Sequence, residues 1–116
     1  MTGVTTISTH VLDISLGVPA AHISVTLERI EEHGITRLSS YVTDDDGRVA
    51  ELVPPDERFP AGSYRLGFDV AGYFAATRRE SFYNRICINF EVDDEPQHYH
   101  VPLLLSPFGY STYRGS

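Results

Sequence analysis

The sequence is poor in the features that mark secreted or membrane-spanning chains. It contains one cysteine, Cys87, and a single cysteine cannot form an internal disulfide, so the chain does not fit the class of disulfide-stapled secreted domains. Its apolar runs are far shorter than the roughly 20 residues that cross a bilayer. Residues 1–10 lack the basic start and apolar run of a signal peptide. We therefore expect a soluble, cytoplasmic protein.

Positive charge is also scarce. Nine Lys and Arg stand against 16 Asp and Glu, a formal net charge of -7 with neutral histidine. Nucleic acids and anionic membranes both require clustered positive charge, so we expect neither as a partner. The 116 residues are 41% hydrophobic and 22% charged. This composition excludes disorder and predicts one domain over residues 1–116.

Alternation of apolar and polar residues with a period of two dominates the chain. Residues 86–93 are the clearest case, and residues 23–28 and 64–70 follow the same pattern, which is typical of half-buried strands. Residues 71–77 are rich in alanine and do not alternate, which predicts a short helix. Weaker strands are predicted over residues 5–13, 35–43 and 48–53. Alternation returns over residues 97–105, a final short strand is predicted over residues 110–113, and Gly-, Pro- and Asp-rich turns lie between the strands. Short strands at this spacing predict an all-β sandwich.

The last long strand combines alternation with a proline. Tyr99 and Val101 fall on one face, and His98 and His100 on the other. Pro102 has no amide hydrogen. This strand is therefore expected either at the edge of a sheet or with its proline nitrogen facing away from the ladder.

Five histidines have to be sorted by position, because only side chains that converge in space can act together. His22 and His33 border turns and are expected at the surface. His10 lies inside the first strand, while His98 and His100 share a face of a later one.

Spacing alone leaves three interpretations of His10, His98 and His100 open. They are structural side chains with satisfied hydrogen bonds in the first interpretation. In the second they hold zinc, since a His-x-His pair with a third histidine matches sites that keep a position for water, although the sequence places no acidic partner beside them. In the third they perform metal-free acid–base chemistry, for which an imidazole pKa of about 6.5 is suited.

Acid–base chemistry on a carbonyl also needs a group that polarises it. Arg48 is a candidate, because it follows the turn at Asp46 and Gly47 and begins a strand. Residues 113–116 add a phenol hydroxyl, a guanidinium, a glycine and a carboxylate directly after a predicted strand. A solvated arginine and a frayed tail are the structural alternatives.

Five stretches carry a family resemblance. They are residues 8–13 (STHVLD), 17–21 (GVPAA), 46–48 (DGR), 61–64 (AGSY) and, above all, 98–116 (HYHVPLLLSPFGYSTYRGS). In this order, over nearly the whole chain, they resemble the transthyretin-like 5-hydroxyisourate hydrolases. The closing Tyr-Arg-Gly-Ser separates these hydrolases from transthyretin, their hormone-carrying relative.

The resemblance implies a two-sheet, transthyretin-like (prealbumin-like) β-sandwich of about eight strands with one short helix. It implies a homotetramer, a dimer of dimers with active sites in a channel between the dimers. The implied reaction is hydrolysis of 5-hydroxyisourate, the product of urate oxidation, to 2-oxo-4-hydroxy-4-carboxy-5-ureidoimidazoline in purine catabolism. Water attacks a ring carbonyl and a carbon–nitrogen bond opens. Neither a cofactor nor a metal is implied.

The resemblance also assigns the catalytic roles. His10 is expected to activate the water, and His100 to orient it or relay a proton. Arg48 is expected to hold the substrate and stabilise the developing oxyanion. Ser116 is grouped with these catalytic residues because it closes the site.

Further residues are expected around the substrate. Tyr113 is expected to contact the planar ring or to donate a hydrogen bond, and His98 to line the wall of the site. Gly115 is expected to adopt backbone angles that other residues avoid. Arg114 is expected to join Arg48 and the histidines in a locally positive channel.

Two rival functions remain. One is a transthyretin-type carrier of a hormone or other small ligand, which would be better served by an apolar channel than by converging His10, Arg48 and Tyr113. The other is a zinc-dependent hydrolase that uses His10, His98 and His100. Cys87 is expected to be structural, on the face opposite the core.

Overall fold

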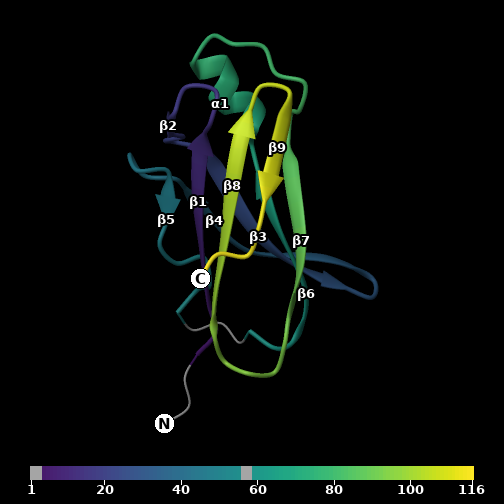
Figure 1. Cartoon of the computed structure of the whole chain (residues 1–116). Coiled ribbons are helices and arrows are strands. Elements are labelled where there is room, and N and C mark those ends of the chain that lie inside the picture. The colour runs from purple at the N-terminus through teal and green to yellow at the C-terminus, as the bar shows by residue number, and fades with distance from the viewer. Residues whose placement is uncertain (1–3, 56–58) are drawn as a thin grey trace.

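The computed structural model describes residues 4–55 and 59–116. Within these residues, nine strands and one helix form a sandwich of two β-sheets, which Figure 1 shows with β8 and β9 in front. The elements are β1 (Thr6–Asp13), β2 (Val18–Pro19), β3 (Ser24–Glu31), β4 (Gly34–Val42), β5 (Arg48–Val49), β6 (Gly62–Phe68), α1 (Val70–Ala76), β7 (Ile86–Val92), β8 (His98–Ser106) and β9 (Gly109–Thr112). The predicted all-β sandwich with one short helix is confirmed.

Strand order determines which residues meet. The first sheet has the order β2-β1-β8-β9, with β5 also paired to β1, and the second has the order β4-β3-β6-β7. β1 and β8 run parallel, so that Thr6 lies opposite His98 and Ser8 opposite His100. The antiparallel pairing of β5 sets Arg48 opposite His10. The first sheet therefore gathers polar side chains that are far apart in the sequence.

Alternation along the strands decides which side chains reach the core. The buried residues of the first sheet include Ile7, Val11, Tyr99, Val101, Leu103 and Leu105, and those of the second include Val25, Leu27, Tyr64, Leu66, Phe68 and Ile86. These are the apolar positions that the period of two predicted. The outer face of β1 and β8 is left with His10, His98 and His100.

Helix α1 covers one end of the sandwich and is tied to β1 by a buried carboxylate. Asp69 caps the helix by accepting a hydrogen bond from Gly72 N at 3.1 Å. Tyr73 Oη donates to Asp13 Oδ2 at 2.7 Å, and Arg79 Nη2 donates to the same oxygen at 2.5 Å. No helix within the described ranges is long and apolar enough to span a membrane.

The electrostatics of Asp13 follow from this burial. Burial alone would raise the pKa of its carboxyl group, but hydrogen bonds from Arg79, Ser15 and Tyr73 outweigh it and lower the pKa to about 2. Asp13 is therefore a charged group at the centre of a satisfied network that joins β1 to the segment after α1.

The strand predicted over residues 48–53 is wrong in its length. Only Arg48 and Val49 pair with β1 as a strand. Beyond them, Glu51 Oε2 accepts hydrogen bonds from the amides of Ile7 at 3.0 Å and Val53 at 2.9 Å. Because the carboxylate takes the place of a carbonyl partner, the regular ladder ends there.

Pro102 lies in an interior strand, between β1 and β9, so the expectation of an edge strand is wrong. The other alternative holds with respect to β1 only, because the proline nitrogen faces away from that ladder and toward the C-terminal segment. The His100 carbonyl accepts a hydrogen bond from Gly115 N at 2.8 Å, so even-numbered residues of β8 turn their backbone groups toward the C-terminal segment and away from β1. β9 ends at Thr112, and the pairing resumes only at the bridge between His100 and Gly115. The gap coincides with the missing amide hydrogen of Pro102.

Candidate active site

His10 and Arg48 are neighbours on the outer face of the first sheet, one on β1 and the other on β5. A tight turn places them. Asp44 Oδ1 accepts hydrogen bonds from the amides of Asp46 and Arg48, both at 2.9 Å. Gly47 in this turn has a φ of 77° and lies so close to the β1 backbone that no side chain fits. The turn formed by the Asp-Gly-Arg sequence thus places Arg48 beside His10.

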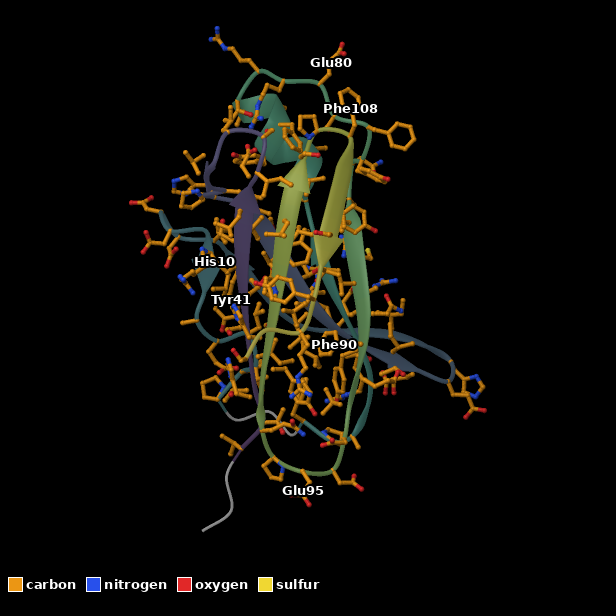
Figure 2. The ribbon with its side chains drawn as sticks, in the orientation of Figure 1. His10, Tyr41, Glu80, Phe90, Glu95 and Phe108 are labelled. Atoms are coloured by element: carbon orange, nitrogen blue, oxygen red, sulfur yellow. The ribbon has the colours of Figure 1, made fainter. Side chains whose placement is uncertain are left out.

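The imidazole of His10 is held through Nε2, which lies 2.9 Å from the carbonyl oxygen of Asp46. Figure 2 shows the labelled His10 beside β1, toward β5. A carbonyl can only accept, so Nε2 carries the hydrogen of the neutral ring and Nδ1 keeps its lone pair. Nδ1 is therefore the atom of His10 that can take a proton from water. The exposed Arg48 offers a planar fork of N–H donors for a negatively charged oxygen.

A second polar group follows the parallel pair of β1 and β8. Ser8 Oγ lies 2.7 Å from His100 Nδ1 and 2.9 Å from His98 Nε2. Thr6 Oγ1 lies 2.6 Å from His98 Nδ1. The two imidazole rings are stacked with their centroids 6.5 Å apart. Both nitrogens of His98 are thus bonded to hydroxyls, whereas His100 is bonded through Nδ1.

The surroundings of His100 favour its neutral form. Burial lowers the pKa of His100 below the usual 6.5, and the charges of His98, Arg48 and His10 lower it further, against a smaller opposing effect of Ser8. These groups come from β8, β5 and β1. At neutral pH the ring therefore has one nitrogen that donates and one that accepts.

The C-terminal segment packs against the other edge of His100. A Cβ atom on Gly115 would lie 2.5 Å from His100 Cδ2. The expected reason for glycine here is wrong, since the described glycines with positive φ are Gly17, Gly34, Gly47 and Gly62. Glycine is needed at position 115 because the imidazole ring occupies the space of a side chain.

The residues around Gly115 do not all reach the histidines in this single chain. Tyr113 is 57% exposed and lines a small hollow together with Tyr99, an inner-face residue of β8. Arg114 Cζ lies 4.6 Å from the centre of the Tyr99 ring, and its Nη2 donates to Gln97 Oε1 at 2.6 Å. The prediction that Arg114 adds its charge to the histidine face is therefore wrong. Ser116 is exposed and directly follows Gly115.

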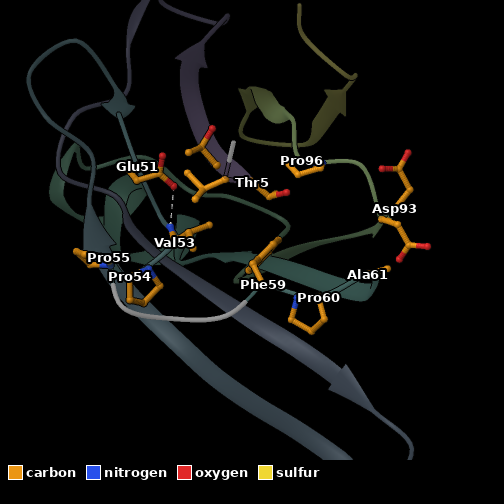
Figure 3. A pocket seen from close by; sticks show the side chains of 13 residues that line it. Thr5, Glu51, Val53, Pro54, Pro55, Phe59, Pro60, Ala61, Asp93 and Pro96 are labelled. Atoms are coloured by element: carbon orange, nitrogen blue, oxygen red, sulfur yellow. Dashed lines mark hydrogen bonds between the residues drawn. The ribbon is translucent and has the colours of Figure 1, made fainter. Parts of the chain in front are cut away.

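The hollow in Figure 3 lies at the end of the sandwich where β1 begins. Thr6 is among its lining residues, but His10, His98 and His100 are not. It encloses about 600 Å³ and is lined by the apolar Val53, Phe59 and Pro60 and by the acidic Glu51 and Asp93. The histidine face is instead an open sheet surface. The hollows lined by Glu51, by His33 and by Tyr113 in the described part of the chain do not include His10, Arg48 or His100.

The remaining predicted residues lie where expected. His22 and His33 are exposed, with 75% and 89% of their side chains accessible. Cys87 is exposed on β7, opposite the core. Within residues 4–55 and 59–116, no three His, Cys, Asp or Glu side chains are grouped so that they could hold a metal ion.

Sequence reasoning missed Thr6 and Ser8 as partners of the histidines. The signal that could have found them is their alternation with His10 along the first strand, which puts all three on one face. Their contacts with His98 and His100 also need the parallel pairing of β1 with β8, and no local pattern in the sequence reveals that pairing.

The fold and the site together define a transthyretin-like β-sandwich that carries histidines and an arginine on the outer face of one sheet. A model described as the HIUase/Transthyretin family matches residues 7–115. The chain is 47% identical over 110 residues to a probable 5-hydroxyisourate hydrolase of Caenorhabditis elegans, a match that covers 95% of this chain and 80% of that relative.

Solved structures agree with this assignment. The structure of Klebsiella pneumoniae 5-hydroxyisourate hydrolase matches with a TM-score of 0.82 at 42% identity, over 96% of this chain and 99% of that one. Sea bream transthyretin in complex with thyroxine matches with a TM-score of 0.86 at 31% identity, over 94% and 93% of the two chains. This chain belongs to the HIUase/Transthyretin family.

Proposed function

We propose that this protein hydrolyses 5-hydroxyisourate. The observation that carries the proposal is the convergence of His10, Arg48 and His100 on one face, through pairings of β1 with β5 and with β8. The names of the relatives described above support the same substrate. The sequence motifs that resemble the hydrolases include all three residues.

Each of the three steps of ring opening has a candidate group. His10 Nδ1 takes a proton from the attacking water, because Nε2 is held by the Asp46 carbonyl. Arg48 stabilises the negative charge that develops on the carbonyl oxygen. The ring of His100, neutral near pH 7, relays a proton to the departing nitrogen as the carbon–nitrogen bond breaks: one ring nitrogen gives a proton while the other takes one, so the ring stays neutral. The product is 2-oxo-4-hydroxy-4-carboxy-5-ureidoimidazoline.

We further propose that the working form is a homotetramer in which this sheet face is covered by another copy of the chain. The face is open in one chain, and a water-exposed surface would screen the charges on which the reaction depends. A second copy opposite it would form a channel, and Tyr113 and Ser116 could then complete the walls of the site. Symmetric pairing is the usual way in which such faces are closed.

A carrier function is the alternative, since sea bream transthyretin in its complex with thyroxine shares the fold. The side chains argue for catalysis. The outer face of β1 and β8 presents His98 and His100 bonded to hydroxyls, and His10 bonded to a backbone carbonyl. A site for an apolar ligand is instead lined mainly by hydrophobic side chains.

The direct test generates 5-hydroxyisourate from urate with urate oxidase and follows its absorbance decay with a metal chelator present. The proposal predicts that decay accelerates in proportion to the amount of protein, with or without the chelator. Activity that is lost on chelation and restored by zinc would contradict the metal-free mechanism. Unaccelerated decay together with tight binding of a small apolar ligand would favour the carrier.

A further inference from the structure

Four side chains on the outer face of the first sheet form one continuous line of hydrogen bonds, here called the hydroxyl–imidazole chain: Thr6, His98, Ser8 and His100. Its links measure 2.6 Å from Thr6 to His98, 2.9 Å from His98 to Ser8 and 2.7 Å from Ser8 to His100. All three lie in the range of good hydrogen bonds. The mechanism proposed above uses only the last member.

The chemistry of these groups couples their protons. A serine hydroxyl has one hydrogen and two lone pairs. When Ser8 donates to His100 Nδ1, its oxygen is left to accept from His98 Nε2–H. His98 Nδ1 then accepts from the Thr6 hydroxyl, because a neutral imidazole has one hydrogen. The state of His100 Nδ1 is therefore linked, bond by bond, to a hydroxyl three links away.

The two ends of the hydroxyl–imidazole chain differ in their surroundings. At the inner end, Gly115 packs against the Cδ2 edge of His100 while Ser8 holds the Nδ1 edge, so the ring is fixed from both sides. At the outer end, the hydrogen bond between Thr6 and His98 is solvent-exposed, and Thr6 also lines the hollow of Figure 3. Water can therefore supply a proton at the Thr6 end.

We propose, resting on the proposed function, that Ser8 and His98 are positioning residues of a proton relay that resupplies His100 during turnover. As His100 Nε2 gives its proton to the departing nitrogen, Nδ1 takes one from Ser8, Ser8 takes one from His98 Nε2, and His98 Nδ1 takes one from Thr6. Thr6 regains a proton from water. The proton that His10 removes from the attacking water returns to solvent. Before the next turnover His100 Nε2 takes up a proton from solvent and the relay runs in reverse, so that Thr6 releases a proton and every group regains its starting hydrogen. Proton uptake and release therefore balance in each turnover.

The charged groups around His100 decide whether its ring can store a proton during the relay. Arg48 from β5 and His10 from β1 act on the same ring as His98, and Gly115 contributes only backbone. Positive charge at Arg48 disfavours an imidazolium at His100. A relay that passes protons between neutral groups suits this environment better than storage of a proton on the ring.

The test compares Ser8→Ala, Ser8→Thr and His98→Phe in the full chain, with Ser40→Ala as the matched control on the exposed face of β4. Ser8→Ala and His98→Phe should each lower kcat about tenfold to a hundredfold with little change in KM. The same range holds for hydrogen-bond partners that orient metal-bound histidines. The double variant should lose little more than either single one. Ser8→Thr keeps the hydroxyl and should recover most of the activity.

Deuterated solvent gives a second readout that a structural role would not move. In the wild type, kcat should depend on the deuterium fraction with curvature, because several protons move, and in Ser8→Ala the dependence should become linear. An increase of KM alone in His98→Phe, or additive losses in the double variant, would overturn the relay and leave His98 as a wall residue.

Ring-nitrogen NMR of the substrate-free protein separates this proposal from the proposed function. Ser8→Ala should shift the ring nitrogens of both His98 and His100. Unchanged shifts would refute the hydroxyl–imidazole chain whatever the activity. A wild type without hydrolase activity whose rings still respond to Ser8→Ala would refute the proposed function alone.

Discussion

Replacing Gly115 by alanine is the most local perturbation that the structure offers. The new Cβ atom would lie 2.5 Å from His100 Cδ2, roughly 0.9 Å short of the 3.4 Å at which ordinary contact begins. Either the imidazole or the C-terminal segment must move by about this distance. A displacement of about 1 Å in a catalytic group can cost a factor of about 100 in rate, or about 2.7 kcal/mol in activation free energy.

The fold should tolerate this change, because residues 111–114 are exposed and can move outward. We expect Gly115→Ala to lower turnover of 5-hydroxyisourate about 100-fold while unfolding free energy changes by about 1 kcal/mol or less. Gly109→Ala is the control, since its nearest neighbour would be Ser106 Oγ at 3.7 Å. If Gly115→Ala and Gly109→Ala are equally active, the Gly115 segment does not position His100.

Three further outcomes are expected. The pKa of Asp13 is about 2 in the folded protein, below its usual 3.8. Its carboxylate therefore stabilises the fold by roughly 2 kcal/mol above about pH 4, and this stabilisation is lost as the pH falls toward 2. In urea, Asp13→Asn should be less stable than wild type at pH 7, and the difference should shrink below pH 4. Arg48→Gln removes a positive charge near His100 and should raise the pKa of His100 toward 6.5 in an NMR titration; an unchanged pKa would refute this coupling. Sedimentation should show a tetramer, and a fully active monomer would contradict a site closed by another copy.

Local patterns predicted much of the fold because apolar and polar side chains alternate along several of its strands. The run around Ile86 and the run around Tyr99 both place their apolar positions in the core. The alanine-rich segment after Asp69 forms α1 within one residue of its predicted bounds. Local patterns could not show where a side chain, rather than a backbone carbonyl, accepts the hydrogen bond of a strand amide. Glu51 ends β5 early for this reason.

The candidate site was predictable only in part. The motif resemblance singled out His10, Arg48 and His100, and the strand pairings place them on one face. The hydrogen bonds of Ser8 were not predictable, because they depend on a parallel pairing between segments about 90 residues apart. The direction of Arg114 was missed for a similar reason, since its aromatic partner Tyr99 is defined by tertiary packing.

The central claim is that hydrolysis takes place on the outer face of β1, β5 and β8. The measurement that tests it most directly is the rate of 5-hydroxyisourate decay with wild type, Arg48→Gln and Arg37→Gln, the last being an exposed arginine on β4 of the other sheet. Wild type and Arg37→Gln should accelerate the decay equally, and Arg48→Gln should fall by a factor of about 100 or more, as when an oxyanion-stabilising donor is removed. A fully active Arg48→Gln protein, or a wild type that leaves the decay unchanged, would contradict the account.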